Sequence, residues 1–192
     1  MTYQAAGEQS YRGKMPLETG LQLETPRLQL RLMDASDIDD LLCIFGDPKV
    51  MASFKAATFN REQMEHWTQR NLDHQNQYGY GLFSVILKSE KLLIGDCGLE
   101  HMKVDGVQET ELGYDFRSDY WNQGYATEAA SAVRDHAFKV LKLPKLISLI
   151  RIGNMASKRV AEKVGMQLVA EISENGIPYW KFAMEVKPNL QV

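Results

Sequence analysis

A polar loop between an expected strand and an expected helix has the residue types that bind an anion. The strand ends near Phe116, and the helix opens with the small residues Gly124 and Ala126 around Tyr125. Small residues let a ligand approach the backbone closely, and the unpaired N–H groups of a helix start favour negative charge. A diphosphate would fit such a seat, although a glycine at this junction is also ordinary turn chemistry. Neither GxGxxG nor GxxxxGK[ST] occurs in the chain, which excludes the two best-known phosphate loops.

Glu111 suits acid–base chemistry by its type and position. It lies on a strand expected over residues 109–116, where alternation places it with Gly113 and Asp115 on the face opposite the apolar residues. An amine with a pKa between about 8 and 10.4 must lose a proton before it attacks a carbonyl. A carboxylate on this strand can accept that proton, directly or through water. The alternative is a surface carboxylate on an edge strand.

The hydrophobic pattern predicts the elements that position these residues. Strands are expected at 28–32, 81–87, 92–99, 109–116, 146–152, 168–172 and 179–185, and helices at 36–45, from 60 to about 72, 125–141 and 154–164. The order β-α-α-β-β-β-α-β-α-β-β predicts one α/β domain over residues 21–192, with a mixed, largely antiparallel central sheet flanked by helices. We expect residues 1–20 to form a loosely ordered extension.

Local signals place several boundaries. Ser36 or Asp37 can cap the first helix, and Asn60 with Gln63 has the spacing of a capping box for the second. The dipeptide at 105–106, Asp-Gly, is a hairpin signal between two of the strands.

Composition excludes several classes of function. Hydrophobic residues make up 44% of the chain and charged residues 24%, the net charge is -3, and no run of Lys or Arg exceeds two. A nucleic-acid binder needs a basic footprint that is missing here. A mildly acidic surface tolerates a cationic amine. No stretch approaches the roughly 20 apolar residues of a membrane span, and the N-terminus lacks an apolar signal region. We therefore expect a cytoplasmic protein without membrane association.

Cysteine and histidine spacing predicts neither a disulfide framework nor a metal site. Cys43 and Cys97 lie far apart without CxxC spacing, and the four histidines are scattered. Both cysteines are expected to be reduced thiols of the core.

Four segments in order resemble the GNAT acetyltransferases, specifically their RimJ/RimL-like branch. They are ETPRLQLR at 24–31, ELGY at 111–114, WNQGYATE at 121–128, and NMAS with EKVGM within 154–166. The wider superfamily begins the loop with Gln or Arg, and a Trp at that place is usual for this branch. The resemblance spans roughly residues 23 to 186 and implies the GNAT acyl-CoA N-acyltransferase fold.

The resemblance also implies roles for individual residues, with acetyl-CoA as co-substrate and no metal. The strand end Asp115, Phe116 and Arg117 would pair its backbone with the pantetheine arm, and Arg117 would either contact the pyrophosphate or stay solvated. Asn154 would face the cofactor, cap its helix, or do both. The pyrophosphate would be bound by the backbone N–H groups of Asn122, Gln123, Gly124, Tyr125, Ala126 and Thr127.

The implied reaction is N-acetylation by direct attack of an amine in a ternary complex. Glu111 matches a position where several GNAT enzymes keep a base, and Ser157 is a candidate for contact with the CoA sulfur. Tyr125 and Tyr179 are alternatives for the group that assists the departing thiolate. No cysteine falls within the matched segments, so an acyl-enzyme is not expected, and Cys97 is the one residue that could contradict this.

The acceptor stays open at this point. In the resembling branch acceptors include protein N-termini, notably of ribosomal proteins, and small amines. A protein that binds acetyl-CoA as a sensor without turnover, and a plain interaction domain, are the alternatives. Dimers are common in the family, so a homodimer is one state to test.

Overall fold

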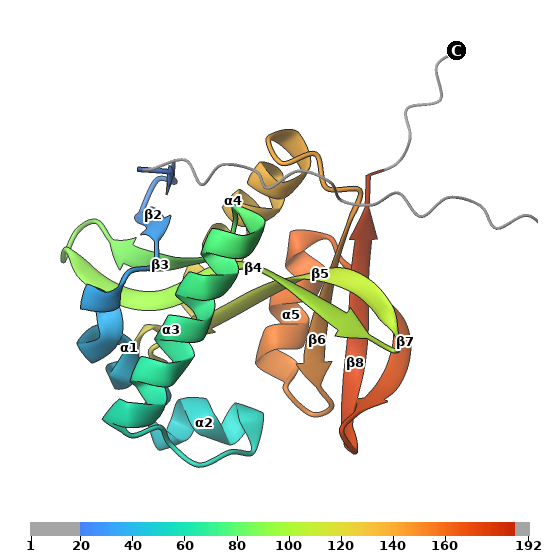
Figure 1. Ribbon diagram of the computed structural model, residues 1–192, viewed down its shortest axis with the longest axis horizontal. Helices are drawn as coiled ribbons and strands as arrows, with labels where there is room; N and C mark the ends of the chain where they lie inside the picture. The colour runs from blue at the N-terminus through green and yellow to red at the C-terminus, as the bar shows by residue number, and fades with distance from the viewer. Residues whose placement is uncertain (1–19, 187–192) are drawn as a thin grey trace, which may run out of the picture.

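The computed structural model describes residues 20–186, which form one open sheet with helices on both faces (Figure 1). The strand order is β1-β2-β3-β4-β5-β6-β8-β7. Every neighbouring pair is antiparallel except β5 and β6, which are parallel. The predicted mixed, mostly antiparallel α/β fold is confirmed. The predicted N-terminal extension lies almost entirely outside the described residues.

Apart from one additional helix at Pro48–Phe54, the elements from residue 28 onward follow the predicted order with shifts of their ends. The strands are β1 (Gln22–Glu24), β2 (Leu28–Leu32), β3 (Leu82–Leu87), β4 (Leu92–Val104), β5 (Val107–Phe116), β6 (Lys145–Arg151), β7 (Gln167–Glu174) and β8 (Ile177–Glu185). The helices are α1 (Ile38–Phe45), α2 (Pro48–Phe54), α3 (Arg61–Tyr78), α4 (Tyr125–Lys139) and α5 (Met155–Val164), with short 3-10 turns at Ala35–Asp37 and Ser118–Tyr120.

Two elements were not predicted. β1 is a three-residue strand paired with β2, too short to show a periodic pattern. Helix α2 begins with Pro48 in its first turn, and the Asp47 side chain caps it by accepting from the backbone N–H of Lys49 at 2.8 Å. In the sequence pattern Pro48 indicates the end of α1, but proline is also frequent in the first turn of a new helix.

Helices α1 to α3 and helices α4 and α5 pack on opposite faces of the sheet, over separate apolar clusters. Residues of α1, α2 and α3 pack against Leu82 and Leu93 in the smaller cluster, and these helices lie together in Figure 1. Residues of α4 and α5 pack with Cys97, Leu99 and Leu112 in the larger cluster. Cys97 and Leu99 on β4 and Leu112 on β5 therefore face α4 and α5.

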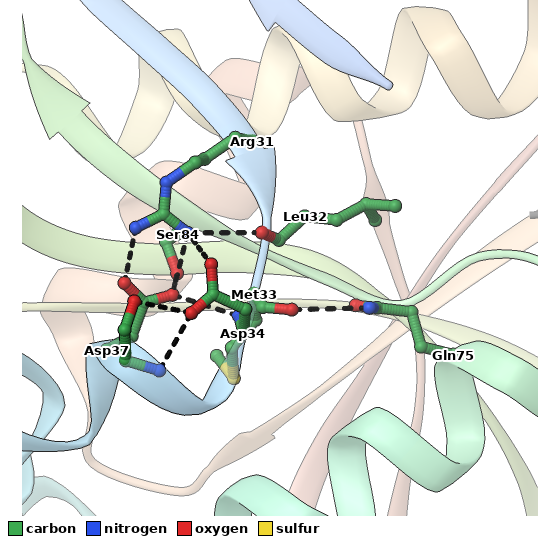
Figure 2. A network of polar contacts seen from close by, with 8 residues as sticks. Arg31, Leu32, Met33, Asp34, Asp37, Gln75 and Ser84 are labelled. Carbon is green, nitrogen blue, oxygen red and sulfur yellow. Dashed lines mark hydrogen bonds and ion pairs between the residues drawn. The ribbon is translucent and has the colours of Figure 1, made fainter. Parts of the chain in front are cut away.

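A buried carboxylate fixes the start of α1 against the sheet (Figure 2). Asp37 is 2% exposed and accepts from the guanidinium of Arg31, from Ser84 Oγ at 2.6 Å and from Asp34 N–H at 3.0 Å. A buried charge must be paired in this way. Asp34 caps the preceding turn. Asp37 is the N-cap residue of α1, one of the two residues predicted, but its side chain makes no capping bond to this helix and pairs with Arg31 and Ser84 instead.

Other predicted boundaries are confirmed. The capping box of Asn60 and Gln63 is present, with bonds of 2.9 Å in both directions. Asp105 and Gly106 form the turn between β4 and β5 with φ of 49° and 81°, which matches the primed turn of a two-residue hairpin.

Candidate active site

The sheet opens between β5 and β6, and a cavity lies at this opening. The two strands are paired at one position only, Glu111 with Ile147, while β5 is paired with β4 along its whole length. The cavity has a volume of about 440 Å³. It is lined from β4, β5, β6, the start of α5, the end of α2 and the turn between β7 and β8. A ligand at this place can reach backbone groups that no neighbouring strand pairs.

Glu111 lies where β5 and β6 separate. Its Oε1 accepts from the backbone N–H of Leu149 on β6 at 2.8 Å. Burial of the carboxyl group raises its pKa to about 8, and the charges of Glu100 and Asp115 act in the same direction against the bond from Leu149. Because β5 lies between β4 and β6, Glu111 is not on an edge strand, and the alternative of a surface carboxylate is wrong. A carboxyl group with this pKa can act as a base near neutral pH.

Three further carboxylates lie on the same face of β4 and β5. Burial, with a smaller contribution from Glu100, raises the pKa of Asp115 to about 7. Burial also raises the pKa of Glu100, and it raises that of Asp96 well above the ordinary value. Sequence analysis singled out only Asp115 among these. The strand register, counted outward from the turn at 105–106, pairs Glu100 with Glu111 and Asp96 with Asp115. This register would have predicted the positions of Glu100 and Asp96.

No side chain caps the start of α4, where the sequence predicts an anion site. Gly124 is the N-cap residue with φ of 85°, and no side chain caps the helix. The first bond of the helix runs from Glu128 N–H to Gly124 O at 3.0 Å, so the amides of Tyr125, Ala126 and Thr127 have no partner inside the helix. The loop follows directly on β5, which runs out of the cavity. The Ala126 side chain packs toward the larger apolar cluster.

The loop before α4 is held by the N-terminal segment, which sequence analysis did not foresee. Glu128 accepts from Thr25 Oγ1 at 2.6 Å, from Arg27 N–H at 3.0 Å and from the Arg27 guanidinium at 2.6 Å. The same guanidinium donates to Gln123 O at 2.9 Å and lies 4.3 Å from the ring centroid of Tyr125. These contacts fix the loop, and no side chain caps the start of α4.

Trp121 and Arg117 make local contacts in the loop. Trp121 is 40% exposed, and its indole N–H donates to Phe116 O at 2.8 Å, which ties the loop back to the end of β5. The Arg117 guanidinium pairs with Asp119 at 3.0 Å. Its contact with a pyrophosphate stays a prediction.

Asn154 and Ser157 both line the cavity at the start of α5. Asn154 Oδ1 accepts from the Ser157 N–H at 3.1 Å, so Asn154 caps the helix, and its position on the cavity wall is compatible with a second role. The Ser157 carbonyl accepts from the Tyr114 hydroxyl at 2.8 Å, which joins α5 to β5. Tyr179 also lines the cavity, whereas Tyr125 lies outside it, against Arg27.

The two cysteines differ from each other. Cys97 is buried in the larger apolar cluster, and burial, followed by the charge of Asp96, raises its pKa well above the ordinary value. A thiol of this kind is a poor nucleophile. Cys43 is exposed on α1, so the prediction that it belongs to the core is wrong.

Two negative findings hold for the described part of the chain. Within residues 20–186, no three His, Cys, Asp or Glu side chains gather closely enough to hold a metal ion. None of the helices in that range is long and apolar enough to cross a membrane.

The structure therefore has a carboxyl group of raised pKa, an opened strand edge and an uncapped helix start along one path. Glu111 lies at the inner end of the opening, and the start of α4 lies beyond the outer end of β5. A donor with a diphosphate and an extended arm would span this distance along β5. The carbonyl it delivers would then lie near Glu111.

Comparison with known proteins agrees with this geometry. Residues 27–167 match the family model described as "Acetyltransferase (GNAT) domain". The uncharacterized protein YkkB of Bacillus subtilis (strain 168) is 36% identical over 148 residues, which are 76% of this chain and 84% of that protein. The uncharacterized N-acetyltransferase YnaD of the same organism is 30% identical over 147 residues, 77% of this chain and 83% of that protein.

A solved structure shares the fold. It is an acetyltransferase of the GNAT family from Bacillus anthracis, with a TM-score of 0.73 and 27% sequence identity. The alignment covers 86% of this chain and 98% of that one.

Proposed function

This chain belongs to the GNAT acetyltransferase family and is an acyltransferase, and from this premise we propose that it moves an acetyl group from acetyl-CoA to a primary amine. The observation that carries the proposal is the position of Glu111. It is a carboxyl group with a pKa of about 8, at the point where β5 and β6 separate. A base is needed there if an amine attacks a thioester that lies along β5.

The backbone at the opening between β5 and β6 is accessible to a ligand such as CoA. A Cβ built at Gly113 meets no atom within 4 Å, so the backbone of β5 is accessible at that position. A Cβ at Gly124 would meet only Arg27, at 3.4 Å. We assign the pantetheine arm to the backbone of Asp115, Phe116 and Arg117. The pyrophosphate is assigned to the N–H groups of Asn122, Gln123, Gly124, Tyr125, Ala126 and Thr127, and Asn154 and Ser157 are assigned to the cofactor side of the cavity.

Glu111 acts as the general base in this proposal. It removes a proton from the ammonium form of the acceptor, directly or through water, and the free amine attacks the thioester carbonyl. A C–N bond forms, the C–S bond breaks, and CoA leaves as a thiolate that takes up a proton. Ser157 is our candidate for contact with that sulfur, and Tyr179, which lines the same cavity, is the alternative.

The transfer is proposed to be direct. Cys97 is buried with a raised pKa and is not among the residues that line the cavity. The donor and the acceptor must then be bound at the same time, and the cavity extends toward α2 and the β7–β8 turn, away from α4.

The finer assignment within the family is also a proposal. The segments at 24–31, 111–114, 121–128 and 154–166 support the RimJ/RimL-like branch, in which the acceptor is a protein N-terminus or a small amine. A sensor that binds acetyl-CoA without turnover is the alternative function. A cytoplasmic location and a homodimer stay predictions.

A turnover assay read as release of free thiol, together with calorimetric titration of CoA, tests the proposed function. We expect CoA binding in the wild type and turnover with at least one acceptor among N-terminal peptides, diamines and aminoglycosides. Binding without turnover across the whole panel would favour the sensor. Replacing Ala126 with Trp should abolish CoA binding, and because its side chain packs toward the core, a melting curve must show that the variant still folds. Unchanged CoA affinity in a folded Ala126→Trp variant would refute the loop assignment.

A further inference from the structure

One hydrogen bond joins the loop after β5 to the start of helix α2. Ser118 Oγ donates to Asp47 Oδ2 at 2.5 Å, although the two residues are 71 positions apart in the sequence. Asp47 is also the N-cap residue of α2, and its Oδ1 accepts from the backbone N–H of Lys49 at 2.8 Å. One carboxylate therefore binds a loop and a helix at the same time, with one oxygen for each.

Both sides of the Asp47–Ser118 bond lead to the cavity. Ser118 follows directly on Arg117, the last of the residues that we assign to the pantetheine arm. Helix α2 runs from its cap at Asp47 to Ser53 and Phe54, which line the cavity. The bond therefore connects the proposed cofactor path with the part of the cavity wall that lies toward α2.

Helix α2 depends on its cap. It has seven residues, and a helix of this length is not stable by itself in water. Val50 and Met51 pack into the smaller apolar cluster, but Lys55 ends the helix with φ of 48°, and residues 56–60 form no regular structure. An N-cap side chain typically changes the opening equilibrium of a helix about fivefold. The orientation of the Asp47 carboxylate therefore affects how often α2 opens.

The loop fixes that orientation. The turn Ser118–Tyr120 is tied to the sheet by the Tyr120 hydroxyl, which donates to Glu90 Oε2 at 2.6 Å. The bond from Ser118, followed by the bond from the N–H of Lys49, lowers the pKa of Asp47, so the carboxylate is charged at neutral pH. A cofactor bound to the backbone on both sides of Ser118 restricts this turn further.

We propose that Asp47 is a positioning residue that couples cofactor binding to the acceptor side of the cavity. CoA bound along the loop holds Ser118, and Ser118 holds the Asp47 carboxylate in the orientation that caps α2. The helix then opens less often, so Ser53 and Phe54 stay on the cavity wall when the acceptor binds. This inference rests on the proposed binding of CoA along β5 and the loop.

Hydrogen exchange followed by mass spectrometry tests the coupling, with CoA alone as the probe. In the wild type, saturating CoA should slow exchange in the loop at 122–127, and it should slow exchange in α2 about fivefold. In Ser118→Ala, which removes the donor and leaves the cap, CoA should still slow the loop but not α2. Ser118→Thr restores the hydroxyl and should restore the response of α2.

The matched control is Ser36→Ala. The Ser36 hydroxyl donates to Asp34, the N-cap residue of the turn before α1, at 2.5 Å. Its removal deletes the same kind of bond at another cap, so CoA should slow both the loop and α2 as in the wild type.

A second variant separates the two functions of Asp47. In Asp47→Ser the single side-chain oxygen can cap α2, since serine caps helices about as well as aspartate, and no second oxygen is left for Ser118. Exchange of α2 without CoA should stay close to that of the wild type, and the response to CoA should be absent.

The outcomes distinguish this inference from the proposed function. If CoA slows α2 equally in the wild type and in Ser118→Ala, or slows only the loop in the wild type, the coupling through Asp47 is refuted while CoA binding at the loop stands. If calorimetry shows CoA binding and exchange of the loop does not change, the proposed cofactor site is wrong, and the coupling is refuted with it.

Discussion

The guanidinium of Arg27 lies 2.6 Å from the carboxylate of Glu128, although the two residues are 101 positions apart in the sequence. The contact joins the turn between β1 and β2 to the first turn of α4. Through its second bond, to the carbonyl of Gln123, Arg27 also fixes the loop that precedes the helix. Two of the segments that resemble the GNAT family are therefore parts of one structural unit.

Removal of the Arg27 side chain should weaken CoA binding more than it weakens the fold. The guanidinium is 43% exposed, so its ion pair stabilises the protein by less than about 1 kcal/mol. Without the bond to Gln123 the loop must be ordered by the ligand, and we expect Kd for CoA to rise about fivefold in Arg27→Ala. Calorimetry and melting curves measure both effects. Arg61→Ala is the control, because Arg61 forms an exposed pair with Asp39 far from the loop. Equal CoA affinity in both variants would contradict the role of Arg27.

Glu111→Gln should lower turnover and leave CoA affinity unchanged. Loss of a general base reduces kcat by about a hundredfold or more. In the wild type the carboxylate form appears as the pH rises through about 8, so kcat should increase with pH up to that value, and this limb should be absent from the variant. Initial rates between pH 6 and pH 9.5 at saturating acetyl-CoA provide the measurement. The same pH profile in both proteins would remove Glu111 from the mechanism.

The raised pKa values also predict how stability depends on pH. The folded state holds the Glu111 proton up to about pH 8 and the Asp115 proton up to about pH 7, whereas the ordinary pKa values of these groups are 4.5 and 3.8. Between these limits the folded state binds more protons than the unfolded state, so the free energy of unfolding falls as pH rises. Asp37 and Glu109 have lowered pKa values, so they change the free energy of unfolding only at more acidic pH.

We therefore expect a lower Tm at pH 8.5 than at pH 6. The double variant Glu111→Gln with Asp115→Asn cannot lose these protons, and its Tm should fall less over the same range. Differential scanning calorimetry of the free proteins makes the comparison. An identical decrease in both proteins would show that other groups cause the pH dependence.

Alternation along a strand was sufficient to place Glu111 correctly. The pattern of apolar residues on β5 assigns Glu111, Gly113 and Asp115 to one face, and the structure has them there. The depth of Glu111 was not predictable in the same way. It depends on β6, which follows more than thirty residues later and becomes its neighbour only in the folded sheet.

The residues that sequence analysis missed act through long-range contacts. Arg27 meets Glu128 only in the fold, so each looks like an ordinary surface charge in the sequence. Glu100 is different, because the register from the turn at 105–106 would place it opposite Glu111. The missed helix α2 reflects a local ambiguity: Pro48 can end one helix or begin another, and the cap by Asp47 decides for the second.

Thiol chemistry gives the last prediction. In the native protein a reagent for free thiols should react quickly with one cysteine, the exposed Cys43, and with Cys97 only after denaturation. Because burial raises the pKa of the Cys97 thiol well above its usual range, it should not carry an acetyl group during turnover. Intact-mass analysis of protein quenched with acid during turnover should therefore show no acetylated enzyme, and Cys97→Ala should keep its activity if it folds. An acetyl group on Cys97, with loss of activity in the folded variant, would replace direct transfer with an acyl-enzyme.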